Sequence, residues 1–292
     1  MESRNVHVIS DEFFGGVGLR PTHYPHLLSH GAGSVQWFEA ISENYMDSFG
    51  RPREILHKIR EDFPVALHGV SMSLGSPEGL SYEHLSRLKT LVHEIDPMIV
   101  SDHMCWSKFG SHYSHDLLPV EFSEESLRGL IRNIEHAQDF LGRQILIENV
   151  SAYVQSTECE YTEWDFLVKV ARSSGCKILL DINNVYVNAA NFGFDPKEYL
   201  KAIPADLIGQ IHLAGFTDMG EYLFDTHSKA VHEDVWTLFE YKARELSNTP
   251  VLIEWDDDIP NFGRLENELL KAEAHWKLAH APKGSHEKPA VL

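Results

Sequence analysis

Side chains that bind metal ions follow the hydrophobic segments of this sequence with marked regularity. They stand at or just after the ends of six short apolar runs: His68, Asp102 and His103, Glu148 and Asn149, Asp181 with Asn183 and Asn184, His212, and Glu254 with Asp256. Taken alone, such a histidine is more often a hydrogen-bonded core residue, and such a carboxylate more often caps a helix. Asp and Glu are rarely buried unless they are paired or bind a metal, so the whole set indicates a metal centre.

Two pairs of residues strengthen this interpretation through their spacing. Asp225 and His227 are separated by one residue, as are Glu254 and Asp256. In an extended segment, alternate side chains point to the same face, so both members of each pair could reach one metal ion. Asp256 would lie just above Glu254, where a general base or a residue that orients a ligand could act. A surface turn is the alternative for Asp225 and His227.

The ligand types limit the chemistry without naming the metal. Imidazole suits zinc, iron, copper and nickel, whereas carboxylate suits manganese, magnesium and iron, and no thiolate belongs to the set. About nine candidate ligands are too many for one ion, so we expect two or three ions that share bridging carboxylates. Glu148, midway around the series, is the best candidate for the bridge.

A (β/α)8 TIM barrel would bring these distant residues together. Eight apolar runs of strand length punctuate the chain: Gly16–Leu19, Trp37–Ser42, Pro64–His68, Met98–His103, Gln144–Asn149, Lys177–Asp181, Ile208–Leu213 and Pro250–Asp256. Segments with helical periodicity separate them, for example Glu124–Leu141, with Ser123 as a possible N-cap, and a following helix that Thr162 could cap. In such a barrel the C-terminal strand ends meet at one mouth, where active sites lie.

One domain, residues 1–280, accounts for this pattern. A doubly wound open sheet is the main alternative, but it usually has fewer strands, and neither GxGxxG after the first strand nor GxxxxGK[ST] occurs. The segment 281–292 contains Pro, Gly, Ser and Lys, and we expect it to be a flexible tail.

The composition excludes several classes of protein. Among 292 residues, 44 are acidic and 25 basic, giving a net charge of −19, which argues against nucleic-acid binding. Cys105, Cys159 and Cys176 lack CxxC spacing, so neither a disulfide framework nor a cysteine zinc site is indicated. No signal-peptide pattern and no run of 18 apolar residues occurs. We therefore expect a cytoplasmic protein that does not span a membrane.

Ten ordered motifs between about Gly15 and Leu270 resemble the multinuclear non-haem iron-dependent oxidative enzymes, the family that includes the oxidase of methanobactin biosynthesis. They are GVGLRP, FEAISENYM, LHGVSMSLG, SDHMCWS, HDLLP, LIENVSAY, DINNVYVNAANFGFD, QIHLAG, DTHS and IEWDDDIP. The chain is also similar, more distantly, to endonuclease-IV-type and xylose-isomerase-type metallo-barrels. It departs from the endonuclease pattern at Asn184, where that group has a histidine, and an amide oxygen favours iron over tightly held zinc.

The resemblance implies an oxidoreductase that holds two or three iron ions in mixed Fe(II)/Fe(III) form. It implies that O2 is the co-substrate and that cysteine residues of a ribosomally synthesised precursor peptide are oxidised, commonly with a separate partner protein that recognises the leader. By position, the resemblance implies metal ligands at His68, His103, Glu148, Asp181, Asn184, His212, Asp225, His227 and Glu254. Asp256 is the candidate base, and Asp102 could serve only to orient His103.

Some motifs and functions stay open at this stage. The loop Ser111–Asp116, with His112, His115 and Asp116, could touch the substrate or be merely polar, and Glu43 and Asn44 at the mouth are equally ambiguous. Cys105 is not expected to be a ligand. A zinc- or manganese-dependent hydrolase or isomerase is the main alternative function, although the acidic charge counts against a DNA substrate. A metal-storing or peptide-binding barrel without enzymatic activity is a third hypothesis.

Overall fold

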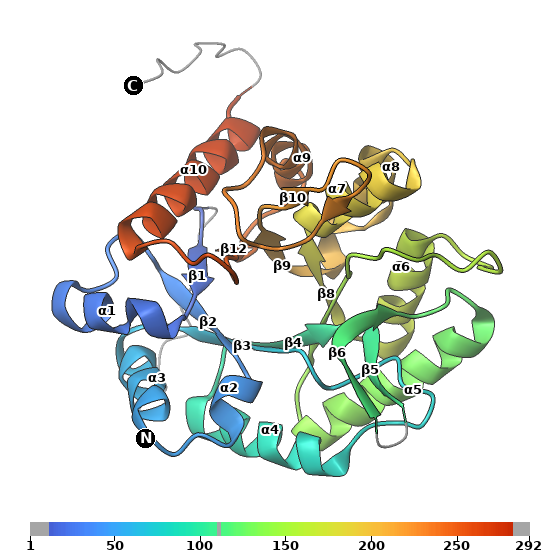
Figure 1. Cartoon of the computed structure of the whole chain (residues 1–292), viewed down its shortest axis with the longest axis horizontal. Coiled ribbons are helices and arrows are strands. Elements are labelled where there is room, and N and C mark those ends of the chain that lie inside the picture. Colours follow the sequence, from blue (N-terminus) through green and yellow to red (C-terminus); the bar gives the residue numbers. More distant parts are fainter. Residues whose placement is uncertain (1–11, 110–111, 283–292) are drawn as a thin grey trace.

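Eight parallel strands close into a barrel at the centre of the molecule (Figure 1). The computed structural model describes residues 12–109 and 112–282. Around the barrel the strands run in the order β1, β12, β9, β8, β7, β4, β3 and β2. Their bounds are β1 Gly15–Gly18, β2 Trp37–Ile41, β3 Val65–Gly69, β4 Ile99–His103, β7 Leu146–Glu148, β8 Lys177–Asp181, β9 Ile208–Leu213 and β12 Val251–Ile253. All eight predicted strands and the predicted TIM-barrel fold are confirmed.

Helices surround the barrel and cover its outer face (Figure 1). They are α1 Tyr24–His30, α2 Glu43–Met46, α3 Arg51–Asp62, α4 Tyr82–Ile95, α5 Glu124–Leu141, α6 Glu163–Ser174, α7 Ile182–Phe192, α8 Pro196–Ala202, α9 Glu233–Ala243 and α10 Phe262–His280, with 3-10 turns at Pro21–His23 and Ala205–Leu207. Because helices lie outside and side chains fill the interior, the strands are buried on both faces. This explains why they form continuous apolar runs in the sequence.

Two helices begin at the N-cap residues that the sequence predicts. The Ser123 hydroxyl accepts a hydrogen bond from the backbone N–H of Ser126, and Thr162 accepts one from Asp165, so both predicted N-caps are confirmed. Among the described residues, no helix is long and apolar enough to cross a membrane. Most of the predicted tail, residues 283–292, lies outside the described residues.

Two antiparallel hairpins were not predicted. β5 (Cys105–Phe109) pairs with β6 (His112–Pro119), and β10 (Thr217–Asp218) pairs with β11 (Leu223–Phe224). The expectation of a loop across Ser111–Asp116 is therefore wrong from His112 onward. These hairpins lie outside the barrel sheet and lack the unbroken apolar run that marks a barrel strand, so their sequence looks like a polar loop.

Candidate metal centre

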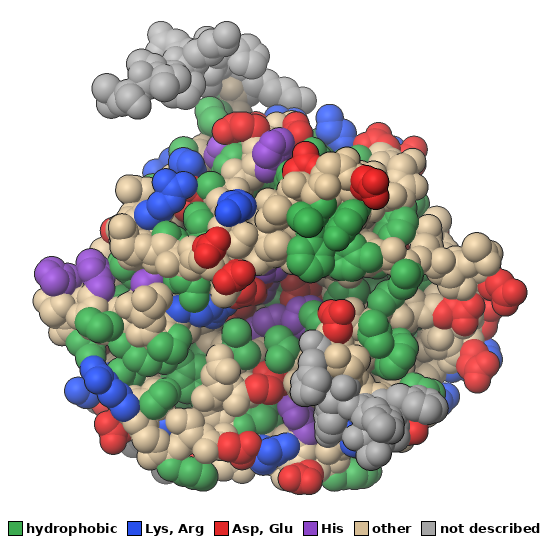
Figure 2. Space-filling model, viewed as in Figure 1, with side chains coloured by type: hydrophobic (Ala, Val, Ile, Leu, Met, Phe, Trp, Pro, Cys, Tyr) green, Lys and Arg blue, Asp and Glu red, His purple; other side chains and the backbone are tan. Residues whose placement is uncertain are grey.

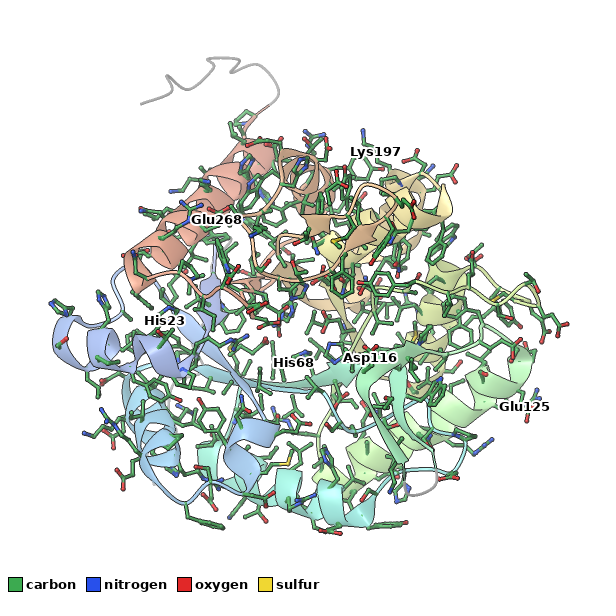
Figure 3. All side chains as sticks on the ribbon, in the orientation of Figure 1. His23, His68, Asp116, Glu125, Lys197 and Glu268 are labelled. Carbon is green, nitrogen blue, oxygen red and sulfur yellow. The ribbon has the colours of Figure 1, made fainter. Side chains whose placement is uncertain are left out.

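The predicted ligands converge in the mouth of the barrel. Figure 3 labels His68 at the middle of the ring of strands, with Asp116 on the neighbouring β6. Figure 2 shows histidine and acidic side chains at the bottom of a hollow on this face. The nine predicted ligands come from six barrel strands or the segments directly after them, as expected if C-terminal strand ends position them.

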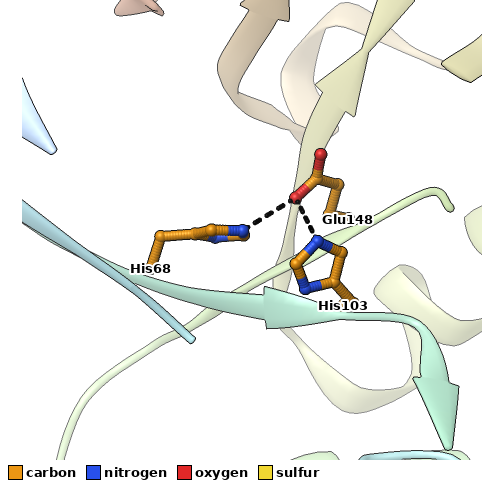
Figure 4. Close-up of side chains that lie close together, drawn as sticks. All are labelled: His68, His103 and Glu148. Carbon is orange, nitrogen blue, oxygen red and sulfur yellow. Dashed lines mark ion pairs between the residues drawn. The ribbon is translucent and has the colours of Figure 1, made fainter. Parts of the chain in front are cut away.

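Glu148 joins two histidines from neighbouring strands (Figure 4). One carboxylate oxygen, Oε2, lies 3.2 Å from Nε2 of His68 and 3.3 Å from Nε2 of His103. The Nδ1 atoms point elsewhere: that of His68 lies 2.8 Å from the hydroxyl of Ser101, and that of His103 lies 3.0 Å from the carbonyl oxygen of Gly69. Because a carbonyl only accepts, His103 carries its proton on Nδ1, which leaves Nε2 free to bind a metal.

The other oxygen of Glu148 faces a second group. Oε1 lies 3.5 Å from Nδ1 of His212, and that nitrogen is 2.8 Å from Oε2 of Glu254. The other imidazole nitrogen of His212, Nε2, lies 3.2 Å from Oε1 of Glu39. Since the two oxygens of Glu148 face different groups of candidate ligands, the geometry supports the predicted bridging position.

A third group of candidate ligands includes Asp225 and His227, in the segment directly after β11. Nε2 of His227 is 2.7 Å from Oδ1 of Asp225 and 3.9 Å from Oδ2 of Asp181, so the two-residue spacing does place both side chains at the mouth. Asn183 donates a hydrogen bond of 2.7 Å to Oδ1 of Asp225. His227 has a φ of 47°, a left-handed backbone conformation that costs about 1–3 kcal/mol and is held by the surrounding contacts.

Asp181 and Asn184 each use one polar atom for structure and leave the other free. Oδ1 of Asp181 caps α7 by accepting a hydrogen bond from the backbone N–H of Asn184, while Oδ2 has no partner. The amide nitrogen of Asn184 donates to the carbonyl of Asn149, while its oxygen has no partner. The helix-cap and ligand interpretations of Asp181 are thus compatible.

Unpartnered buried atoms make the strongest case that a metal fits here. The buried nitrogens of His212 (Nδ1) and His227 (Nε2) contact only carboxylates of other predicted ligands. Three further predicted ligands each offer a buried oxygen without a hydrogen-bond partner: Glu148 Oε2, Asp181 Oδ2 and Asn184 Oδ1. Leaving such atoms unsatisfied costs about 1–3 kcal/mol each. The ligand atoms of Glu148, Asp181, His212 and Glu254 lie within 4.8 Å of one another, as do those of His68, His103 and Glu148. The donor set therefore fits metal ions.

The electrostatics also favour a cation. Burial raises the pKa of Glu148 to about 7 and the pKa of Asp181 well above its usual range. Burial alone would lower the pKa of His212, but the carboxylates of Glu39, Glu254 and Glu148 outweigh it and raise that pKa well above 6.5. Protons therefore neutralise the cluster when no metal is bound, and metal ions would replace them.

Asp256 lies at the rim of the cluster. Its carboxylate forms an ion pair with Arg20, and its Oδ2 lies 3.2 Å from Nδ1 of His227. Although burial would raise the pKa of Asp256, His227 and Arg20 outweigh burial and hold that pKa well below its usual range. Asp256 is therefore ionised and able to orient His227, and the same pairing makes it a weak base.

Other residues from the sequence analysis lie elsewhere. Asp102 points away from the centre and accepts hydrogen bonds from the backbone N–H groups of Met72 and His103. Asn149 links β7 to β8 through both backbone groups of Asp181. Cys105 is buried on β5 and belongs to no candidate ligand group among the described residues. The side chains of His112 and His115 are outside the described part of the chain.

Three residues at the centre were missed. Glu39 and Gln210 lie within their strands rather than at the ends, and both contact Nε2 of His212. The sequence does contain a signal for Glu39, because a carboxylate inside the apolar run WFEAI is unusual unless it has a partner. Arg20 follows the first strand, and because it is a cation that pairs with Asp256 it has no place in a pattern of metal ligands.

A cavity of about 430 Å³ opens above the candidate ligands. Apolar side chains, including Ile41, Val70, Leu118 and Phe224, share its wall with the ligands His68, His103 and His227. Cavities of this size hold small ligands or a few residues of a peptide.

The fold and the site define a TIM barrel with a buried histidine–carboxylate cluster at its mouth. Solved structures of other TIM barrels superpose on the fold. A xylose isomerase-like TIM barrel protein from Mycobacterium smegmatis, in complex with magnesium, superposes with a TM-score of 0.59 over 93% of this chain and 99% of that one, at 10% identity. Endonuclease IV from Thermus thermophilus gives 0.56 over 91% and 99%, at 14% identity. At such identities the likeness extends to the fold alone.

The chain belongs to the family described as RiPP precursor modification enzyme MbnB/TglH/ChrH, which it matches over residues 14–277. A UPF0276 protein from Anaeromyxobacter sp. (strain Fw109-5) is 51% identical over 88% of this chain and 90% of its own length. RiPPs are ribosomally synthesised and post-translationally modified peptides, so family membership implies an enzyme that modifies a precursor peptide. The resemblance found in the sequence motifs is confirmed.

Proposed function

We propose that this protein is a multinuclear non-haem iron enzyme that uses O2 to oxidise cysteine residues of a ribosomally synthesised precursor peptide. The observation that carries the proposal is the buried cluster of histidines and carboxylates around Glu148, in which Glu148, Asp181 and Asn184 each keep an oxygen without a hydrogen-bond partner. Imidazole, carboxylate and amide donors without thiolate are compatible with iron. The family match supports the peptide as substrate.

The proposed ligands are the nine residues predicted from the sequence: His68, His103, Glu148, Asp181, Asn184, His212, Asp225, His227 and Glu254. Two or three ions in mixed Fe(II)/Fe(III) form are expected, with Glu148 between two of the groups. When bound, iron supplies one-electron redox chemistry and the capacity to activate O2. The rest of the chemistry depends on how the chain's own residues hold the peptide and its protons.

The cavity and Asp256 supply these functions. The apolar wall of the cavity would hold the peptide segment around the reacting cysteine and exclude water from the metal centre. Arg20 keeps Asp256 ionised, which is the form that can accept a proton or fix the orientation of His227. A separate leader-recognition partner is part of the proposal. A reducing cytoplasm is the expected compartment, since all three cysteines are free.

The test combines the iron-loaded protein with short cysteine-containing precursor peptides encoded beside its gene, with and without co-expressed neighbouring proteins. We expect O2 consumption together with a mass change on the peptide, and neither with a Cys→Ser peptide. Peptide-independent hydrolysis or sugar isomerisation by the zinc or manganese form, without O2 uptake, would contradict the proposal and support the hydrolase or isomerase alternative.

A further inference from the structure

A second cluster of metal-binding side chains lies behind the barrel wall. It consists of Glu43 at the start of α2, His84 on α4 and Asp102 on β4, whose ligand atoms lie within 4.8 Å of one another. Side chains alternate along a strand, so Asp102 points outward while its neighbour His103 points into the barrel. A pocket of about 310 Å³, separate from the cavity at the mouth, opens onto Glu43 and His84.

The two carboxylates of this cluster are held by backbone groups. Asp102 is fully buried, and it accepts hydrogen bonds from the backbone N–H of His103 at 2.7 Å and of Met72 at 3.1 Å. Glu43 accepts one from Val70 at 3.1 Å through Oε1, while Oε2 is buried without a partner. Gly69 makes room for this arrangement, because a Cβ there would come within 2.3 Å of Oδ2 of Asp102.

His84 completes the cluster with an unpartnered nitrogen. The residue is only 8% exposed, and its Nε2 has no hydrogen-bond partner. That nitrogen lies 3.9 Å from Oε1 of Glu43, which is too far for a hydrogen bond but suitable for two ligands of one ion. Two basic residues also line the pocket, Lys108 and Arg87, and Arg87 is paired with Asp47 at 2.7 Å.

We propose that Glu43, His84 and Asp102 bind one divalent transition-metal ion, Zn²⁺ or Mn²⁺, at a site distinct from the centre in the barrel. Two carboxylates neutralise a divalent ion, and one imidazole with two carboxylates is a donor set that both metals accept. Water from the pocket can fill the remaining coordination positions.

The ion would link three secondary-structure elements beside the candidate metal centre in the barrel, the main centre. It would join α2 and α4 to the end of β4, directly next to His103. It would also fix the end of β3 at Gly69 and the following segment that carries Met72. Because Gly69 also accepts the hydrogen bond from Nδ1 of His103, the proposed site supports the position of one main-centre ligand. The site does not depend on which metal the main centre holds.

Zinc is the probe for the test. Crystals of the protein as isolated are soaked in millimolar ZnCl2, and anomalous differences are measured on both sides of the zinc absorption edge. We expect a zinc peak between the three side chains, whatever the metal in the barrel. A peak confined to the barrel, or none, would overturn the proposal.

Substitutions test the same site in solution by equilibrium dialysis and thermal unfolding. Glu43→Gln keeps an oxygen for Val70, and His84→Ala removes the imidazole. Both should weaken binding of the additional Zn²⁺ by at least about 10-fold and abolish the Zn²⁺-dependent rise in Tm. The matched control is His93→Ala, which removes an exposed imidazole from the same helix and should change neither. Equal zinc affinity in all variants would contradict the proposal. If a variant fails to fold, the wild-type anomalous map decides.

Discussion

At the scale of single residues, the centre is organised around Glu148. Its two oxygens face different groups, with His68 and His103 on one side and His212 on the other. His103 is fixed by a hydrogen bond from Nδ1 to the carbonyl of Gly69, and Asn184 by one from its amide nitrogen to the carbonyl of Asn149. Nε2 of His103 and Oδ1 of Asn184 are therefore held in position without a metal. Preorganisation of this kind lowers the cost of binding.

Glu148→Gln should strip the metal while leaving the barrel folded. Losing a hydrogen-bond partner of a ligand costs about 10–100-fold in metal affinity, so losing the carboxylate between two groups should cost at least as much. Elemental analysis measures the result, and circular dichroism checks the fold. Glu163→Gln, the same change at a partly buried carboxyl that accepts a hydrogen bond from Tyr199, is the control and should keep its metal. Wild-type metal content in Glu148→Gln would rule out the bridging role.

Asp256→Asn should keep the metal and lose turnover. The substitution removes the charge that pairs with Arg20 and contacts His227 but leaves the proposed ligands in place. Because Asp256 orients His227, its loss should slow peptide conversion per iron by about 10–100-fold. Asp257→Asn, at the exposed neighbouring position, should have no effect. Full activity in Asp256→Asn would remove this residue from the mechanism.

At the scale of elements, the barrel strands were predictable and the added hairpins were not. Strands buried on both faces leave continuous apolar runs, and their bounds agree with the sequence within a few residues. Strand-end ligands such as His68 and Asp181 were predictable because chain position alone assigns them to the mouth. Glu39 and Gln210 were missed because they lie within strands, and which residues face each other across the barrel depends on the register between strands.

The segment that carries Asp225 and His227 packs against Gly215. A Cβ at Gly215 would lie 2.3 Å from the carbonyl oxygen of Lys229 and 2.5 Å from that of Ala230. Gly215→Ala should therefore displace this backbone, lower the free energy of unfolding by about 1–3 kcal/mol and reduce metal content. Denaturation and elemental analysis measure both effects.

Gly129 provides the control for that substitution. A Cβ at Gly129 on α5 would meet nothing closer than 3.9 Å, so Gly129→Ala should stabilise the protein by roughly 0.5–1 kcal/mol. Unchanged stability and metal content in Gly215→Ala would mean that the loop does not depend on this close approach.

Glu163 at the start of α6 should make stability depend on pH. Burial raises the pKa of Glu163 from 4.5 to about 7. The folded state therefore binds this proton more tightly, and the resulting stability is complete below 4.5 and lost as pH rises towards 7. Glu163→Gln should remove up to about 3 kcal/mol of this decline, at roughly 1.36 kcal/mol per pKa unit. Urea denaturation from about pH 4 to 8 measures the difference. The exposed Glu158→Gln should retain the wild-type slope, and a matching slope in Glu163→Gln would contradict the assignment.

At the scale of the whole molecule, one barrel holds an acidic centre inside an acidic protein with a net charge of −19. The fold is shared with epimerase and endonuclease barrels at sequence identities too low to carry function. The family match therefore carries the expectation of peptide modification, and the candidate metal centre at the mouth is where that chemistry is proposed to occur.

Metal content tests the central claim most directly. The protein is purified without oxygen from iron-supplemented cells and studied by elemental analysis and Mössbauer spectroscopy. We predict two to three irons per chain in the barrel, with some Fe(II) coupled to Fe(III). Stoichiometric zinc with negligible iron would contradict the iron oxidase and favour hydrolytic chemistry.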